Sequence, residues 1–280
     1  MPSLDWYDCP IVLPYYGGKY EMSKKLIPLL PPHERYIEVF AGGLSMFFRK
    51  AKAKWNVLND KDKNIVNLYM SVILKRKELI DNLFWIPKSR DLFLDFKGEI
   101  RDENHTFEIP DPLQAAKYLY CIRYSFNKLI HTPFSMNKDM NKDWEAELTY
   151  SRKFLGGATI ENLDFEELID RYNPRKGDFW YLDPPYIVAT EKGSYYNHSF
   201  DMEDHKRLRE SVQKIHDNGG HFMVSYDYRE EVAELYKDFD CRTLDWKYVG
   251  ATDEARQKGR KEYVIINYEP TQQINIFKED

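Results

Sequence analysis

Hydrophobic and polar positions follow two different periods along this chain. Short apolar runs bounded by turn residues are typical of buried strands, and apolar residues three and four apart are typical of helices packed against a sheet. The pattern predicts a strand from Tyr36 into the glycine turn at 42–43, followed by a helix that runs to about Lys54. Further strands are predicted at 57–60, 158–163, 177–182 and 221–226, and further helices at 62–74, 203–217 and 229–237.

Strands that alternate with helices predict an α/β fold with a Rossmann-like sheet, in which ligands bind at the carboxyl ends of the strands. Near the end of the sequence the alternation stops. The runs at 243–249 and 262–268 are predicted to form two antiparallel edge strands. The segment between them, 250–261, holds several basic residues that either face phosphate or are solvated.

Residues 76–157 interrupt this alternation. Apolar residues at helical spacing recur at 80–96 and 112–123, and polar, irregular pieces are expected at 97–110 and 130–145. We therefore expect one catalytic domain built from residues 1–75 and 158–280, with residues 76–157 inserted as a helical and irregular region.

Composition narrows the class of protein. Hydrophobic residues make up 42% of the 280 residues, yet no apolar run approaches the roughly 20 residues of a membrane span. The first residues lack a basic and apolar leader. The three cysteines are odd in number and far apart, unlike a disulfide framework or a zinc site. We expect a soluble, cytoplasmic protein that needs no metal and does not bind a membrane.

The net charge of −5 does not suit a simple nucleic-acid coat protein. An enzyme that acts on DNA can still be acidic overall when its basic residues gather on one face. The densest mixture of basic and aromatic residues lies at 123–142, where Arg123, Lys128 and Lys138 are candidate DNA contacts. The alternative is that each of them belongs to a solvated loop.

The segment Asp183-Pro184-Pro185-Tyr186 follows a predicted buried strand. Its prolines cannot donate hydrogen bonds to a sheet and favour extended backbone, so the strand ends in a stiff loop. The loop offers a carboxylate at Asp183, a carbonyl at Pro184 and an aromatic ring at Tyr186.

These three groups suit one chemical problem. An exocyclic amine on an aromatic base is a poor nucleophile, because its lone pair is delocalised into the ring. Two acceptors that hold both amine hydrogens localise the lone pair as it attacks, and an aromatic ring can stack on the base. We therefore interpret Asp183, Pro184 and Tyr186 as catalytic residues.

The four-residue segment resembles the catalytic motif of amino-methyltransferases that act on adenine in DNA. Upstream, a Tyr-Gly-Gly-Lys sequence at 16–19 precedes a strand, a Gly-Gly turn, a helix and a second strand that ends in Asn59-Asp60. This order is similar to the S-adenosylmethionine pocket of the Dam-type adenine methylases. The chain thus resembles a Dam-like (D12 class) site-specific DNA adenine-N6 methyltransferase, over about residues 13–268.

The resemblance implies that S-adenosyl-L-methionine is the cofactor. It assigns Tyr15 and Lys19 to the methionine end, with Lys19 near the carboxylate, and Asp60 to the ribose. The residues alone leave alternatives open. Lys19 is also explained as a solvated lysine in a surface turn, and Asp60 as the N-cap of the helix predicted at 62–74.

The resemblance places more residues in the cofactor pocket. Phe40 and Gly42 line it, Asp164 and Phe165 lie near the adenine of the cofactor, and Asp183 touches both the cofactor and the target amine. Asp164 is equally well explained as a helix N-cap and Phe165 as a core residue.

The substrate implied is double-stranded DNA, with the target adenine flipped out of the duplex. Residues 76–157 would be the target-recognition region, and 187–200 would surround the extruded base, with Tyr196 and Phe200 as candidates. The family usually has a longer β-hairpin before the step seen here at Pro133-Phe134. The GATC specificity of many relatives is therefore not carried over. A cognate restriction endonuclease is a possible partner, and we expect a monomer or a weak dimer.

Other activities use similar groups. An N4-cytosine DNA methyltransferase needs the same two acceptors, although its first motif residue is more often Ser. Methylation of RNA adenine or of protein glutamine uses a related loop, generally with Asn at that position. Carbon methylation of cytosine needs a Pro-Cys pair, which this sequence lacks. A catalytically inactive DNA-binding relative is the alternative from another class of protein.

Overall fold

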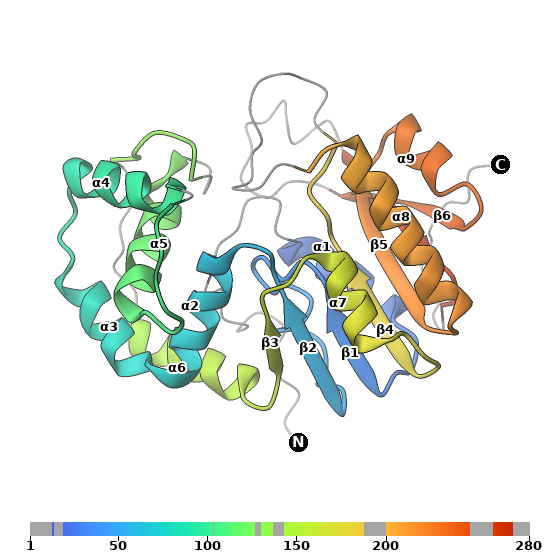
Figure 1. Cartoon of the computed structure of the whole chain (residues 1–280), viewed down its shortest axis with the longest axis horizontal. Coiled ribbons are helices and arrows are strands. Elements are labelled where there is room, and N and C mark those ends of the chain that lie inside the picture. The colour runs from blue at the N-terminus through green and yellow to red at the C-terminus, as the bar shows by residue number, and fades with distance from the viewer. Residues whose placement is uncertain are drawn as a thin grey trace.

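The computed structural model describes residue 13 and residues 19–102, 104–126, 130–136, 143–187, 200–246 and 260–270. Its centre is a seven-stranded sheet with the strand order β3-β2-β1-β4-β5-β7-β6 (Figure 1). Parallel pairing joins the first five strands of that order, whereas β7 runs antiparallel to both β5 and β6. The strands are β1 (Arg35–Glu38), β2 (Trp55–Asn59), β3 (Thr159–Glu161), β4 (Asp178–Leu182), β5 (His221–Asp227), β6 (Asp240–Trp246) and β7 (Arg260–Ile266).

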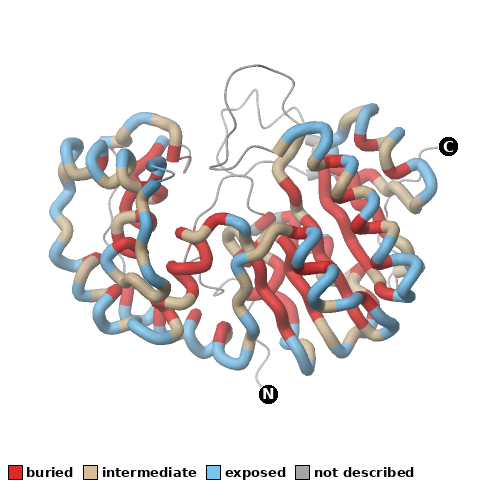
Figure 2. The backbone as a smooth tube through the Cα atoms, in the orientation of Figure 1, coloured by how far each residue is buried: buried red, intermediate tan, exposed pale blue. Residues whose placement is uncertain are grey.

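Both faces of the sheet are covered, and Figure 2 shows its central strands as buried. In β4, Phe179 and Tyr181 belong to the core on one face, and Trp180 and Leu182 to the core on the other. This alternation is that of a strand buried on both sides. The second face is packed by α7 (Phe165–Tyr172), α8 (Met202–Asp217) and α9 (Glu230–Leu235). The first face is packed by α1 (Tyr20–Leu26), the short helix η1 (Ile27–Leu29) and α2 (Lys63–Leu74).

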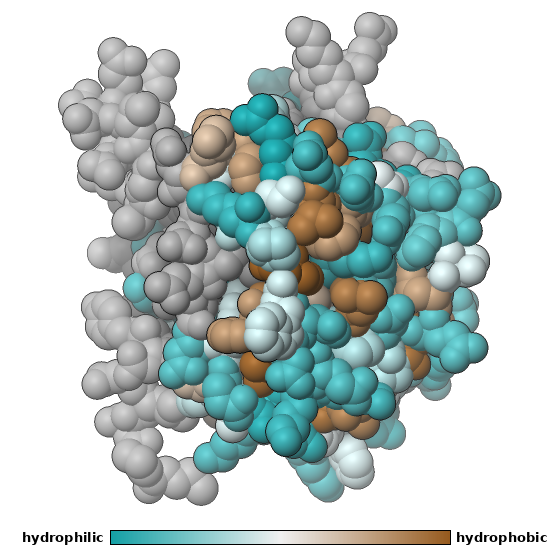
Figure 3. Space-filling model, turned by 90° about the vertical axis from the view of Figure 1, so that its left-hand side faces the viewer, coloured by the Kyte–Doolittle hydropathy of each residue, from teal (hydrophilic) through white to brown (hydrophobic). Residues whose placement is uncertain are grey.

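Four helices lie together beside the sheet, on the left of Figure 1. They are α3 (Arg76–Trp85), α4 (Arg90–Arg101), α5 (Pro112–Tyr124) and α6 (Trp144–Leu155). Helix α5 packs against α2, α3 and α4, and its buried side chains belong to the same hydrophobic core as α2. Figure 3 looks onto this side of the molecule and shows mostly hydrophilic residues with separate hydrophobic patches. The division into a catalytic domain and an inserted region at 76–157 stays a prediction.

The sequence patterns place most elements correctly. The predicted helix at 62–74 is α2, and Asp62 caps it by accepting from the Asn64 N–H at 2.9 Å. The predicted antiparallel pair near the end of the chain is β6 and β7. However, of these two strands only β6 is an edge strand, because β7 lies between β5 and β6.

Two helix predictions are wrong, and helices α1 and α6 were not predicted. The segment after Gly42-Gly43 forms successive turns instead of a helix, and Leu44 has a φ of 51°, which an α-helix does not contain. The helical pattern at 80–96 is divided between α3 and α4, because Pro87 lacks an N–H and pushes Ile86 into extended backbone. Helix α6 was missed, although Asp143 caps it by accepting from the Ala146 N–H at 3.0 Å.

Candidate active site

The candidate site lies beside β1, where the order in which the chain adds strands to the sheet reverses. The chain leaves β1 to form β2 on one side of it, and later returns to place β4 on the other side. Segments that follow β1 and β4 therefore separate at this point, which is the position where open α/β sheets bind ligands. The residues after β1 include Phe40 and Gly42, and those after β4 are Asp183, Pro184, Pro185 and Tyr186.

Lys19 joins two of the predicted catalytic residues. Its Nζ lies 2.9 Å from Oδ1 of Asp183, donates to the hydroxyl of Tyr186, and lies 4.6 Å from the centre of the Tyr186 ring. Only 4% of the Lys19 side chain is exposed, so the solvated-turn alternative is wrong. All three residues were predicted from sequence, but their mutual contacts were not.

Two further residues complete this cluster, and sequence reasoning missed the role of both. Glu262 on β7 is buried, and its Oε2 lies 3.4 Å from Nζ of Lys19. Ser225 on β5 donates to Oδ1 of Asp183 at 3.2 Å. The signal for Ser225 was its place at a strand end, and Glu262 had no signal except an acidic residue in an apolar strand. We call Lys19, Asp183, Tyr186, Ser225 and Glu262 the Lys19 cluster.

The electrostatics of the cluster keep Lys19 positively charged. Burial alone would lower the pKa of its ammonium, but Asp183, Tyr186 and Glu262 together raise that pKa well above its ordinary value. Burial raises the pKa of the Asp183 carboxyl, whereas Lys19 and Ser225 oppose this shift. The cluster thus contains one ammonium shared by the buried carboxyl group of Glu262 and the half-buried one of Asp183.

Asp60 lies beside the glycine turn. Its Oδ2 accepts from the Gly42 N–H at 2.8 Å, and its Oδ1 accepts from the Asp62 N–H at 2.9 Å. Gly42 has a φ of 44°, and its carbonyl accepts from the hydroxyl of Tyr69 at 2.6 Å. The N-cap alternative for Asp60 is wrong, since Asp62 caps α2. Burial raises the pKa of Asp60 to about 7 although the two N–H groups oppose this shift.

An aromatic cluster borders the same end of the sheet. The rings of Phe40 and Phe165 lie 6.0 Å apart, and Phe200 lies 6.0 Å from Phe40 and 5.8 Å from Phe165. Phe200 also contacts His205, whose Nδ1 lies 2.7 Å from the hydroxyl of Tyr226. The structure therefore brings Phe200 to the residues predicted for the cofactor, and Tyr196 lies outside the described residues.

Asp164 has structural partners of its own. It caps α7 by accepting from the Glu166 N–H at 3.1 Å, which confirms the N-cap alternative, and pairs with Lys61 at 3.1 Å and with Arg207 at 3.0 Å. Burial by itself would raise the pKa of Asp164, but these three partners together lower it. Phe165 is buried, as the core alternative predicted.

Of the three predicted DNA contacts, only Arg123 lies within the described residues. Arg123 pairs with Glu147 at 3.4 Å and lies 5.0 Å from the Trp144 ring, so its guanidinium already has partners within the helical region. Lys128 and Lys138, like Tyr15, lie outside the described residues. The roles given to these four residues stay predictions.

The described residues contain neither a membrane-spanning helix nor a metal-binding group of side chains. No helix in that part of the chain is both long and apolar enough to cross a membrane. In the same residues, no three His, Cys, Asp or Glu side chains are grouped as a metal would require.

The sequence is similar to known DNA methyltransferases. The family model of the D12 class N6 adenine-specific DNA methyltransferases matches residues 15–249. The chain is 28% identical to the type II methyltransferase M1.LlaDCHI of Lactococcus lactis subsp. cremoris, over 90% of this chain and 93% of that protein. It is 24% identical to the DNA adenine methylase of Salmonella typhi, over 80% of this chain and 83% of that protein. A solved methyltransferase structure from Agrobacterium tumefaciens matches with a TM-score of 0.41 and 9% identity, over 90% of this chain and 61% of that one.

The fold and the site define an α/β methyltransferase with an acceptor-rich loop after its fourth strand. Because the family model matches most of the sequence, the chain belongs to the D12 class N6 adenine-specific DNA methyltransferases. It is an enzyme that transfers a methyl group from S-adenosyl-L-methionine to the N6 amino group of adenine in DNA.

The state of Asp60 leads to a prediction about cofactor binding. Its pKa of about 7 means that it gains a proton as the pH falls through neutrality, and a protonated carboxyl accepts hydrogen bonds less well. We expect the affinity for the cofactor to rise with pH from 6 to 8, by up to about tenfold per unit below the pKa. Calorimetric titration at several pH values checks this. An Asp60→Asn variant is expected to bind more weakly at every pH and without this dependence, and an unchanged pH dependence in it would contradict the role.

Proposed function

We propose that the Lys19 cluster and the Pro184 carbonyl form the catalytic centre of this enzyme. The observation that carries the proposal is the contact of Lys19 with both Asp183 and Tyr186 at the carboxyl end of β4. These contacts fix the carboxylate and the ring of one loop relative to each other. A loop held in this way offers acceptors that are already oriented for the transition state.

In the proposed mechanism, Asp183 and the Pro184 carbonyl each accept one hydrogen of the adenine amine, and Tyr186 stacks on the base. The carboxylate then stabilises the positive charge that develops on the nitrogen. When bound, S-adenosyl-L-methionine supplies a methyl group already activated by its sulfonium. The protein has to bind it in line with the amine, exclude water and accept the proton that leaves.

Lys19 is proposed to keep Asp183 ionised. A buried carboxyl group becomes a weaker acid, and a neighbouring ammonium opposes this effect. Lys19 is shared with Glu262, so the three groups carry a net charge of −1 when both carboxyl groups are ionised. A negative site favours a cationic cofactor and the charge that develops on the amine. The contact of Lys19 with the methionine carboxylate, and the role of Tyr15, stay part of this proposal.

The chain's residues suit a nucleoside at the proposed cofactor site. Asp60 ends β2 with a carboxylate that can accept from ribose hydroxyls, beside the Gly42 turn. Phe40 and Phe165 supply aromatic faces for the adenine of the cofactor, and Phe200 extends them. Asp164 precedes Phe165 and pairs with Arg207, and we propose that it helps to position Phe165 beside the adenine of the cofactor.

For the substrate, we propose a specific sequence in duplex DNA, with the adenine flipped out at a cost of a few kcal/mol. Residues 76–157 would form the target-recognition region. A type II relative suggests a restriction endonuclease partner. We further propose that the enzyme works in the cytoplasm, where its substrate would be, as a monomer or a weak dimer.

The proposal is tested by single-molecule sequencing of DNA from a methylation-free bacterial host that expresses this chain, beside the Asp183→Ala variant. We expect methyl-adenine at one recurrent sequence, absent from the variant. Methyl-cytosine in place of methyl-adenine would show that the enzyme is an N4-cytosine DNA methyltransferase. Adenine methylation that persists in the variant would remove Asp183 from the catalytic centre.

A further inference from the structure

Helix α4 carries three cationic residues on one face. Arg90, Lys97 and Arg101 are seven and four positions apart, and a helix with 3.6 residues per turn aligns such positions in one row. The acidic residues Asp91 and Asp95 fall on the neighbouring face. The row spans about 16 Å of helix axis at 1.5 Å per residue. We call Arg90, Lys97 and Arg101 the α4 basic face.

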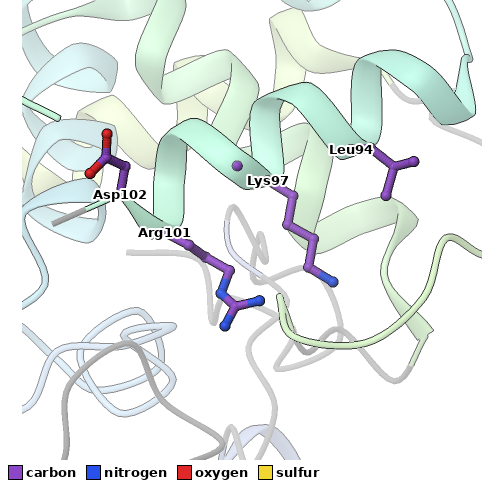
Figure 4. Close-up of a pocket in the computed structure, with 5 residues that line it drawn as sticks. Leu94, Lys97, Arg101 and Asp102 are labelled. Carbon is purple, nitrogen blue, oxygen red and sulfur yellow. The ribbon is translucent and has the colours of Figure 1, made fainter. Parts of the chain in front are cut away.

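An open hollow of about 430 Å³ lies along this face, lined by Leu94, Lys97, Gly98, Arg101 and Asp102. In Figure 4, the side chains of Lys97 and Arg101 extend from the helix to the same side. Leu94 is 55% exposed and continues the same row towards Arg90. The hollow is therefore open to a large partner, and its charge is cationic.

The segment 130–136 lies along the same face and is bound by its cations. Nζ of Lys97 donates to the Thr132 carbonyl at 3.0 Å, and Nη2 of Arg90 contacts Sδ of Met136 at 3.5 Å. Lys88, just before α4, donates to the Met136 carbonyl at 2.7 Å. These contacts hold the cationic side chains in place without neutralising them.

Asp102 lines the same hollow, but no cation of the α4 basic face forms an ion pair within the described part of the chain. There, no carboxylate lies within 4.0 Å of a nitrogen of Arg90, Lys97 or Arg101, whereas Glu99 pairs with Lys117 at 2.5 Å. Burial and then the nearby Arg101 lower the pKa of Lys97. In a chain with a net charge of −5, adjacent cations that repel each other indicate an anionic partner.

The position of α4 suits the substrate. In Figure 1, α4 lies at the upper end of the group of four helices, and α3 and α6 lie at the lower end. The upper end is level with the start of α8, which follows the loop after β4. Phosphates of one DNA strand recur about every 3.4 Å of duplex axis, so a 16 Å row reaches several of them.

We propose that the α4 basic face binds the phosphate backbone of the duplex DNA substrate and positions it for methyl transfer. The proposal rests on duplex DNA being the substrate. Lys97 and Arg101 each contact a phosphate, and Arg90 extends the contact along the strand. Such contacts set affinity and register and carry no sequence information.

The test measures how DNA binding depends on salt. The double variant Lys97→Gln/Arg101→Gln is titrated into a labelled 30-base-pair duplex of random sequence between 50 and 200 mM salt. Each lost phosphate contact lowers the slope of log affinity against log salt by about 0.9, so the slope is expected to fall by about 1.8. The loss of affinity across this range is then about tenfold smaller than in the wild type. KM for plasmid DNA rises, whereas kcat at saturating DNA and the Kd for S-adenosyl-L-methionine are unchanged.

Two variants serve as controls. Arg152→Gln/Lys153→Gln removes the same two charges from exposed positions on α6, at the other end of the helical group, and is expected to keep the wild-type slope. Lys97→Arg/Arg101→Lys keeps the charges and the slope. Equal slopes in the α4 and α6 variants would overturn the inference. A wild type that neither binds nor methylates duplex DNA would overturn the function itself, which is a distinct result.

Discussion

Asp183→Ala is expected to lower kcat by about 10²- to 10³-fold. The substitution removes one acceptor for the adenine amine and the negative charge that faces it. The fold is expected to survive, because Lys19 keeps Glu262 at 3.4 Å as a partner for its buried ammonium. Single-turnover transfer of a labelled methyl group to plasmid DNA measures the loss, and thermal unfolding measures the stability.

An Asp183→Asn variant separates the two contributions of this carboxylate. Its amide oxygen still accepts one hydrogen but lacks the charge, so we expect activity between that of the wild type and that of Asp183→Ala. If Asp183→Ala methylated adenine at close to the wild-type rate with an intact fold, the proposed catalytic centre would be wrong.

Lys19→Met is expected to impair both stability and chemistry. It leaves the buried carboxyl group of Glu262 and the half-buried one of Asp183 without their shared ammonium, and loss of a buried partner typically costs about 3 kcal/mol of unfolding free energy. It also raises the pKa of Asp183 further, because Lys19 opposes the effect of burial. Asp183 acts as a carboxylate, so activity is lost as the pH falls through its pKa. The acid limb of the kcat profile is therefore expected to move to higher pH.

The pH profile distinguishes this role from simple cofactor binding. If Lys19 only held the methionine end, Lys19→Met would raise the Kd for the cofactor and leave the acid limb in place. The double variant Lys19→Met/Glu262→Gln provides the control, since removal of the second carboxyl group is expected to restore part of the stability and of the acid limb. No restoration would show that Glu262 does not share the charge of Lys19.

The sheet was predictable from sequence because its strands are short and strongly apolar. The run from Phe179 to Leu182 is buried on both faces and stops at prolines that cannot extend it. The helices beside the sheet were less predictable. Pro87 and the cap at Asp143 were visible signals that went unused, whereas the left-handed φ of Leu44 had no signal in a non-glycine residue.

The residues of the candidate site likewise fall into those that were predictable from sequence and those that were not. Asp60 and Asp183 were found because each follows an apolar strand, and their position is a property of one local segment. Glu262 depends on pairing between distant segments, since β7 reaches the site by antiparallel pairing with β5. Arg123 shows the converse, because a cation in a basic and aromatic sequence lies against Glu147 and Trp144. A sequence pattern does not show which charges are already neutralised.

The pairing of Lys19 with Glu262 has a consequence for biosynthesis. These residues are separated by almost the whole sequence, and one lies before the first strand of the sheet while the other lies on the last. Domains fold from the amino terminus as a chain leaves the ribosome, and contacts of such long range form late. A nascent or truncated chain that lacks β7 would leave Lys19 with Asp183 as its one carboxylate partner in the cluster. The enzyme is therefore expected to become fully active only after β7 has been synthesised and has docked.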